Sequence, residues 1–387
     1  MLRQTPTLAV DLHPLSCGCT DLALEALHKS LADPPDSNHV WEPHPDPLLR
    51  ETVEHASHAG TASLRRLFDD LIAHVRELSH VRKAFTPDRA VVAEAIIRLR
   101  GKSSRQYDVD DWLTLIDWLM LQYLPDAFFK TQAEYLTVRA AAAAKIQASH
   151  TEADGALVPV QDFAARMPVT PGELFRRASF SAMELTMLRI AQARAAEAMT
   201  VVGEATRHRI KQLVVNHLQA SLSGDPLAVP KRLERQLFDE FSILNRDWRR
   251  VAITEAGNAR SEGMIGGLAV GTVVRRFEAY AGACDFCRKI NGKTFTVVDA
   301  SNPDKDGATQ VWVGKTNVGR SSSPRKRVGD ELVDRTEDEK WWVAAGTQHP
   351  NCRGGWSVVS TPGHADDKTR DFVNELLKKH GIGRSES

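Results

Sequence analysis

The sequence predicts an α+β protein, with a mainly helical N-terminal and central body and a small α+β C-terminal domain stapled by cysteine and histidine side chains. Three observations predict this fold. Apolar residues recur at helical spacing through much of residues 50–266. Short β-like runs separated by Gly, Asn, Pro and Ser follow Gly267. Two pairs of residues, Cys284/Cys287 and His349/Cys352, stand among those runs.

The composition argues against several classes of protein. Lys plus Arg and Asp plus Glu each number 50 among 387 residues, so net charge gives no general attraction to nucleic acid or membrane. No apolar run approaches the roughly 18 residues of a transmembrane helix, and the N-terminus lacks the apolar core of a secretory signal. Five cysteines, an odd number in a long chain, do not indicate a secreted disulfide framework. We therefore expect synthesis in a reducing cytoplasm and no membrane partner.

The first two regions differ in proline content. Residues 1–49 are expected to be an N-terminal arm with a proline-rich linker, because proline fixes φ and pushes the preceding residue toward extended conformations. Residues 50–178 are predicted to be a helical domain of unknown role. One face of a helix in this domain carries an apolar stripe typical of a bundle core, made of Trp112, Leu115, Trp118, Leu119 and Tyr123.

Residues 179–266 are predicted to be a central region of long helices. In its first half, apolar residues repeat every three or four positions, and Gly203 is expected to interrupt them. The turn sequence SGDP at 223–226 is expected to end that helical stretch. One more long helix follows, with Leu233, Leu237 and Phe241 at i, i+4 and i+8.

Residues 267–387 are predicted to be a C-terminal domain with short strands, a Cys/His cluster and a terminal helix. Cys284-Asp-Phe-Cys287 places two thiolates one ligand spacing apart, and His349-Pro-Asn-Cys352 does the same from a second turn. Together they form a Cys3His set, which is typical of closed structural zinc sites. Because four protein donors leave no position for a catalytic water, we expect zinc to hold structure here.

Other interpretations of these residues stay open. Cys284 and Cys287 are also compatible with a redox pair, or with plain buried cysteines. Cys17 and Cys19 lie outside the set. Known enzyme motifs have little support, because both Gly-Lys-Thr triplets lack the earlier glycine of a P-loop and no His-Glu-x-x-His occurs. A zinc deaminase would need His-x-Glu before its cysteine pair, which is the reverse of the order here.

Arg325, Lys326 and Arg327 form the single dense basic cluster, inside the polar stretch 302–340. They are candidate DNA contacts, and a solvated loop is the alternative. Binding through this cluster would be independent of sequence and would weaken steeply with salt.

Four segments resemble one known family in their order along the chain. The ending GTQHPNCRGGW (346–356) resembles the His-Pro-Asn-Cys-Arg-Cys ending of the phage Mu protein F-like minor head protein family. The Cys284–Cys287 pair followed by KINGKTFT, the helix RRVAITEAGNARSEGMIGG (249–267) and the stretch ARAAEAMTVVGEATRHRIKQLV (193–214) are similar to its preceding segments. The resemblance spans residues 180–360 and leaves residues 1–150 unassigned.

The sequence also departs from that family. Gly354 stands at the second C-terminal cysteine, Ile253 at the arginine of an Arg-Thr-Glu motif, and Ala281 and Gly282 where an aspartate often precedes the cysteine pair. The resemblance implies a minor head component of tailed phages or prophages, inside the capsid or at the portal vertex. Its implied partners are portal, capsid or scaffold proteins and phage DNA, and its implied role is head assembly and DNA packaging or delivery. A nuclease or transferase in the C-terminal domain is the alternative.

A polar helix face links the two parts of the prediction. Glu255, Asn258 and Glu262 fall at i, i+3 and i+7 and therefore share one face of their helix. We expect this face to dock on the C-terminal domain, with an ordinary solvated face as the alternative.

Overall fold

The structure is a computed structural model that describes residues 39–76, 97–154 and 170–360, together with Asp371, Phe372, Glu375, Lys378 and Lys379. Its helices in these ranges are η1 (His39–Trp41), α2 (Pro47–Val75), η2 (Ser104–Gln106), α4 (Val109–Tyr123), α5 (Asp126–Asp154), α7 (Pro171–Arg177), α8 (Ala182–Leu222), α9 (Pro230–Gly267), α10 (Asp285–Ile290) and η3 (Glu337–Glu339). Its strands are β1 (Val273–Phe277), β2 (Thr294–Val297), β3 (Gln310–Val311), β4 (Arg325–Val328), β5 (Glu331–Asp334) and β6 (Gly355–Ser360).

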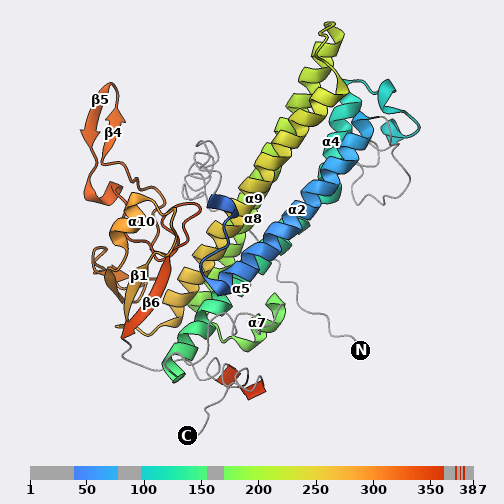
Figure 1. Ribbon diagram of the computed structural model, residues 1–387. Coiled ribbons are helices and arrows are strands. Elements are labelled where there is room, and N and C mark those ends of the chain that lie inside the picture. The colour runs from blue at the N-terminus through green and yellow to red at the C-terminus, as the bar shows by residue number, and fades with distance from the viewer. Residues whose placement is uncertain are drawn as a thin grey trace.

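The long helices α2, α4, α5, α8 and α9 lie side by side in an elongated bundle (Figure 1). One hydrophobic cluster joins them and includes Leu71, Leu115, Leu136, Met199 and Leu237, one from each helix. The regions expected as separate units, 50–178 and 179–266, therefore share a core. None of the helices in the described part of the chain is long and apolar enough to cross a membrane.

Helix α8 runs without a break from Ala182 to Leu222, so the expectation that Gly203 interrupts it was wrong. Its first turn is closed by a capping box, in which the Glu184 amide donates to the Ser181 hydroxyl at 3.2 Å. A Cβ at Gly203 would lie 2.7 Å from the Phe129 ring of α5. Glycine therefore serves close helix packing at this position. The end of α8 at Leu222 confirms the stop predicted at SGDP.

Trp248 of α9 anchors the middle of the bundle. Its side chain is buried, and its indole N–H donates to the Ala56 carbonyl of α2 at 2.9 Å. The ring stacks on Phe128 with centroids 5.5 Å apart. Gly60 lies directly over the indole, where a Cβ would come within 2.1 Å of Nε1. The crossing of α2 and α9 therefore depends on the absence of a side chain at residue 60.

The end of the N-terminal arm is packed and is not a free linker. Residues 40–46, which we call the N-terminal strap, lead into α2, and within them Val40 and His44 are buried. The expected arm with its proline-rich linker is thus packed over residues 40–46, where buried arginine side chains hold its carbonyl groups. Residues 1–38 lie outside the described residues.

The C-terminal module is a sheet of strand order β3-β2-β1-β6 with α10 beside it. β1 pairs antiparallel with β2 and β6, whereas β2 and β3 are parallel. Its hydrophobic core combines sheet residues such as Phe295 and Trp356 with Met264 and Ile265 from the last turns of α9. The end of α9 therefore belongs to the core of the module, and the module packs against the side of the helical bundle (Figure 1).

Two further parts extend the module. β4 and β5 form a hairpin that projects from it (Figure 1). In the expected terminal helix, all five described residues are helical and Phe372 is buried. Leu376 and Leu377 of that helix lie outside the described residues.

Replacing Gly60 with Ala is expected to destabilise the protein by about 1–3 kcal/mol, because the new methyl group must displace the Trp248 indole in a packed core. Urea unfolding followed by tryptophan fluorescence measures the change. Gly172→Ala is the matched control, because its Cβ would meet only the Arg176 guanidinium at 3.7 Å and alanine favours helix. Equal stability of both variants would contradict this account of the α2–α9 crossing.

His44 should make stability depend on pH. Burial, together with the nearby Arg353 and Arg260, lowers its pKa to about 4 despite the opposing Asp46 carboxylate. The unfolded chain then binds a proton that the folded chain rejects, so stability falls as pH drops from 6.5 to 4, by up to about 3 kcal/mol. Urea unfolding at several pH values should show a shallower fall for His44→Gln. Parallel curves would contradict the burial of a neutral His44.

Candidate metal centre

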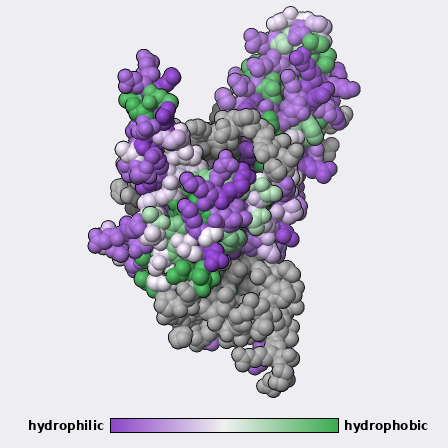
Figure 2. Space-filling model, turned by 60° about the vertical axis from the view of Figure 1, so that its left-hand side comes forward, coloured by the Kyte–Doolittle hydropathy of each residue, from purple (hydrophilic) through white to green (hydrophobic). Residues whose placement is uncertain are grey.

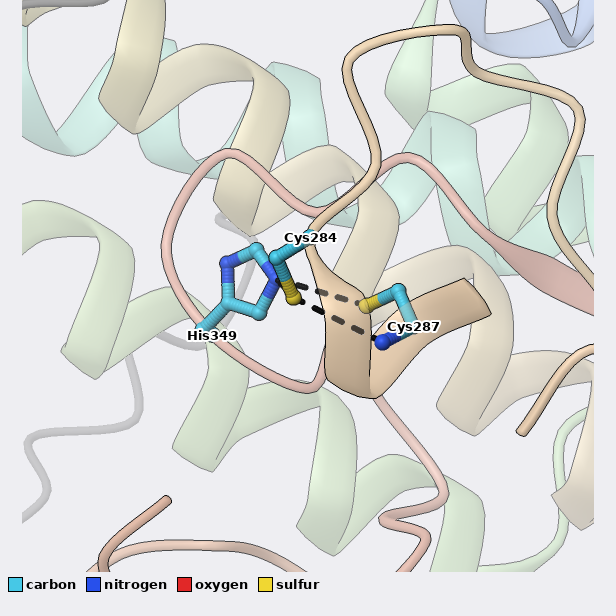
Figure 3. Close-up of side chains that lie close together, drawn as sticks. All are labelled: Cys284, Cys287 and His349. Carbon is cyan, nitrogen blue, oxygen red and sulfur yellow. Dashed lines mark hydrogen bonds between the residues drawn. The ribbon is translucent and has the colours of Figure 1, made fainter. Parts of the chain in front are cut away.

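The first two donors come from the start of α10. Cys284 is its N-cap residue, with extended backbone angles, and the Cys287 amide lies 3.5 Å from the Cys284 sulfur. One helical turn therefore puts both sulfurs on the same side (Figure 3). Cys287 is buried and Cys284 is partly exposed.

The other two donors come from the loop before β6. Asn351 has φ of 63°, a left-handed conformation that asparagine tolerates, and the Cys352 amide donates to the His349 carbonyl at 3.2 Å. This tight turn points His349 toward α10 (Figure 3). The Nδ1 of His349 lies 2.8 Å from the Pro350 carbonyl. Since a carbonyl oxygen can only accept, Nδ1 donates in this contact, and Nε2 is the ring nitrogen that faces the sulfurs.

The donor atoms converge on Cys287. Its sulfur lies 3.3 Å from His349 Nε2 and 3.8 Å from the Cys352 sulfur, and the Cys284 sulfur lies 3.2 Å from the same Nε2. Ligands of one tetrahedral zinc would stand about 3.8 Å apart for two sulfurs and about 3.5 Å apart for sulfur and nitrogen. The donor atoms of Cys284, Cys287 and His349 all lie within 4.8 Å of one another, and Cys352 lies beside Cys287 in a second such set. The four predicted residues therefore form a cluster that could hold a metal ion.

The charges within this cluster are strongly coupled. A hydrogen bond with Cys287 and then the His349 ring lower the pKa of the Cys284 thiol to about 3. Burial would lower the pKa of His349, but the Cys284 and Cys352 sulfurs raise it to about 9. The pKa of Cys352 is likewise lowered by Cys287 and by Arg276, whereas hydrogen bonds to both other sulfurs raise that of Cys287. The thiolate form, which is the form of cysteine that binds a metal ion, is thus favoured at Cys284 and Cys352.

Sequence reasoning missed Glu278, which follows β1. One of its carboxylate oxygens lies within 4.8 Å of both the Cys287 and Cys352 sulfurs. Burial, and then the Cys352 thiolate, raise its pKa to about 7. A Cβ at Gly354 would come within 2.6 Å of this carboxylate, so glycine there leaves room for it. An acidic residue ending the strand before the cysteine pair was the available signal, but only the β1–β6 pairing brings it to Cys352.

Neighbouring side chains support the donors. The Arg276 guanidinium lies 3.5 Å from the Cys352 sulfur and so favours its thiolate form. Trp341 stacks on the His349 ring with centroids 5.8 Å apart. Such surrounding contacts orient metal ligands and tune their basicity.

Two of the three predicted docking residues contact the C-terminal module. Asn258 Oδ1 accepts from the amide and hydroxyl of Thr347, at 2.8 and 2.7 Å. Glu262 accepts from the Gly314 amide at 2.8 Å. Glu255 does not join them, because it lies at the edge of the face toward α8 and accepts from Arg194 at 2.9 Å. Sequence reasoning did not include Thr254 in this face, but its hydroxyl accepts from the Asn351 amide at 2.8 Å.

The predicted basic cluster, Arg325, Lys326 and Arg327, lies on β4 of the projecting hairpin and does not belong to the Cys/His cluster. Arg325 Nε donates to Asp334 at 3.0 Å across the hairpin, and Lys326 pairs with Glu339. Arg327 is exposed. Figure 2 shows the hairpin as a mainly hydrophilic projection with a small hydrophobic patch, to which the exposed Val328 and Leu332 belong. The basic residues thus sit in an ordered hairpin beside acidic partners.

No known protein family, curated protein or solved structure matches this chain. The fold and the site define a mainly helical protein with a small C-terminal sheet module that carries a candidate Cys/His metal centre.

Replacing Cys287 with Ser should abolish stoichiometric zinc binding, because this sulfur lies at the centre of the donor set. With zinc at about 100 times its Kd, the wild-type protein gains about 2.7 kcal/mol of stability that the variant lacks. Elemental analysis and thermal unfolding with and without chelator measure both effects. Cys17→Ser is the control. Full zinc content and an unchanged melting curve in Cys287→Ser would contradict a structural metal.

Proposed function

We propose that this protein is a minor head protein of a tailed phage or prophage. It would act in head assembly and in DNA packaging or delivery, within the capsid interior or at the portal vertex, after synthesis in the host cytoplasm. The observation that carries the proposal is the order of the four family-like segments between residues 193 and 356. Those segments belong to α8, to α9, to α10 with β2, and to the loop leading into β6. α8 packs on α9, and the loop contacts both α9 and α10.

The ion in the Cys/His cluster is proposed to be zinc with a structural role. Three thiolates and one imidazole are soft donors that suit a tetrahedral zinc. The ion would join the start of α10 to the loop before β6 and so tie the two ends of the module together. An assembly protein gains from such a staple, because a small module has little core of its own.

The contacts between the module and α9 fit the same role. Thr254, Asn258 and Glu262 hold backbone groups of residues 314–351 against one helix face. The helical body and the module would then move as one part during assembly. The portal protein, capsid or scaffold proteins and phage DNA are the proposed partners.

The two alternatives have less support. Arg325 and Lys326 face carboxylates, which reduces the charge they could offer to DNA phosphates. A nuclease or transferase would need a reactive group or an exchangeable ligand in the C-terminal module. Glu278 beside Cys287 and Cys352 is the feature that keeps this alternative open.

Co-expression with the portal protein encoded beside this gene tests the proposal. We expect stable, stoichiometric co-elution in gel filtration, with the mass of the complex measured by light scattering. The control replaces the portal protein with an unrelated oligomeric protein. Elution of the protein as a monomer, separate from the portal protein, would contradict the proposal. Nuclease and transferase assays would then be the next tests.

A further inference from the structure

The N-terminal strap is held mainly through its backbone carbonyl groups. Arg353 donates to the Glu42 carbonyl at 3.0 Å and to the Val40 carbonyl at 3.3 Å. Arg249 donates to the same Val40 carbonyl at 2.7 Å. The strap therefore lies between two guanidinium groups that share an acceptor.

The two arginines belong to different parts of the molecule. Arg249 lies on α9, where it also forms an ion pair with Glu54 of α2. Arg353 follows Cys352 directly and stacks over the Tyr280 ring at 4.4 Å. A third arginine, Arg260 of α9, forms an ion pair with Asp46 at the end of the strap. The strap thus joins the helical body to the loop that carries two candidate metal ligands.

All three guanidinium groups are on buried side chains, with exposed fractions of 4% for Arg249 and Arg260 and 2% for Arg353. A buried guanidinium needs acceptors, and leaving one unpaired costs more than its hydrogen bonds contribute. Strap carbonyls supply several of those acceptors. The conformation of Arg353 therefore depends on the strap, and the position of the strap depends on the loop at Cys352.

The strap is docked on Arg249, Arg260 and Arg353. We propose that this docking and metal binding at the Cys/His cluster stabilise each other. A metal ion bound to Cys352 would restrict the backbone of the next residue, Arg353. The Arg353 guanidinium donates hydrogen bonds to the carbonyl groups of the strap. Without the metal, the Cys352 end of that loop would be held less firmly, and the Arg353 hydrogen bonds to the strap would weaken. By thermodynamic linkage, a docked strap raises metal affinity by the same factor.

This coupling rests on metal binding in the proposed function, and it adds a consequence for the N-terminal arm. The metal centre would thereby control how firmly the strap, residues 40–46, is held to the module. Release of the strap would also uncover buried guanidinium groups. Those groups would suit the backbone carbonyls of another extended peptide.

The first experiment follows chymotryptic cleavage after Trp41 in the full chain. Zinc content is measured first, then cleavage is compared for zinc-loaded protein, EDTA-treated protein and protein with zinc restored. We expect cleavage to become roughly tenfold faster without zinc, while cleavage after Trp112 in the bundle core stays slow. A chain without bound zinc would overturn the structural-zinc proposal and, with it, the coupling. A zinc-loaded chain whose cleavage after Trp41 does not change with EDTA would overturn only the coupling.

The second experiment uses Arg249→Met, which removes a strap contact without touching any donor residue. Zinc affinity, measured by competition with a chromophoric chelator, should fall roughly fivefold or more. Arg246→Met is the matched control on α9, because Arg246 pairs with Asp247 and not with the strap. Circular dichroism verifies that both variants fold. Faster cleavage after Trp41 with zinc affinity unchanged would overturn the coupling.

Discussion

The packing of α9 against two hydrophobic cores at once is the constraint on which the rest of this structure depends. Its N-terminal half contributes Leu237 and Trp248 to the bundle, and its last turns contribute Met264 and Ile265 to the sheet module. Between these ends, Asn258 and Glu262 accept hydrogen bonds from module backbone that would otherwise need water. One continuous helix therefore sets the relative position of body and module.

This arrangement also positions the donor residues of the candidate metal centre. The loop before β6 is fixed from outside by Thr254 and Asn258, while Arg276 and Trp341 contact its Cys352 and His349 side chains. The candidate donors are thus held close together by contacts from outside the cluster. A metal ion would join them through bonds to one shared cation.

The features that sequence predicts best are those with a local signature. Helical periodicity and the SGDP turn locate the end of α8, and two-residue spacing identifies Cys284, Cys287, His349 and Cys352. Gly203 misleads, because the same residue type that breaks a helix also permits close packing against Phe129. Glu278 and Thr254 escape notice because β1–β6 pairing and the docking of α9 bring them to the site from distant positions.

The strap shows a different limit of sequence reasoning. Prolines in residues 40–46 favour an extended chain, which is equally typical of a linker and of a peptide bound through its carbonyl groups. Its recognition comes from Arg249 and Arg353, which stand far apart in sequence and carry no shared motif. Because carbonyl groups occur at every residue, the strap sequence itself holds no sign of its partner. The N-terminal arm, a long helix and the loop that carries two candidate metal ligands meet at one carbonyl group, that of Val40, and only the folded structure brings these three segments together.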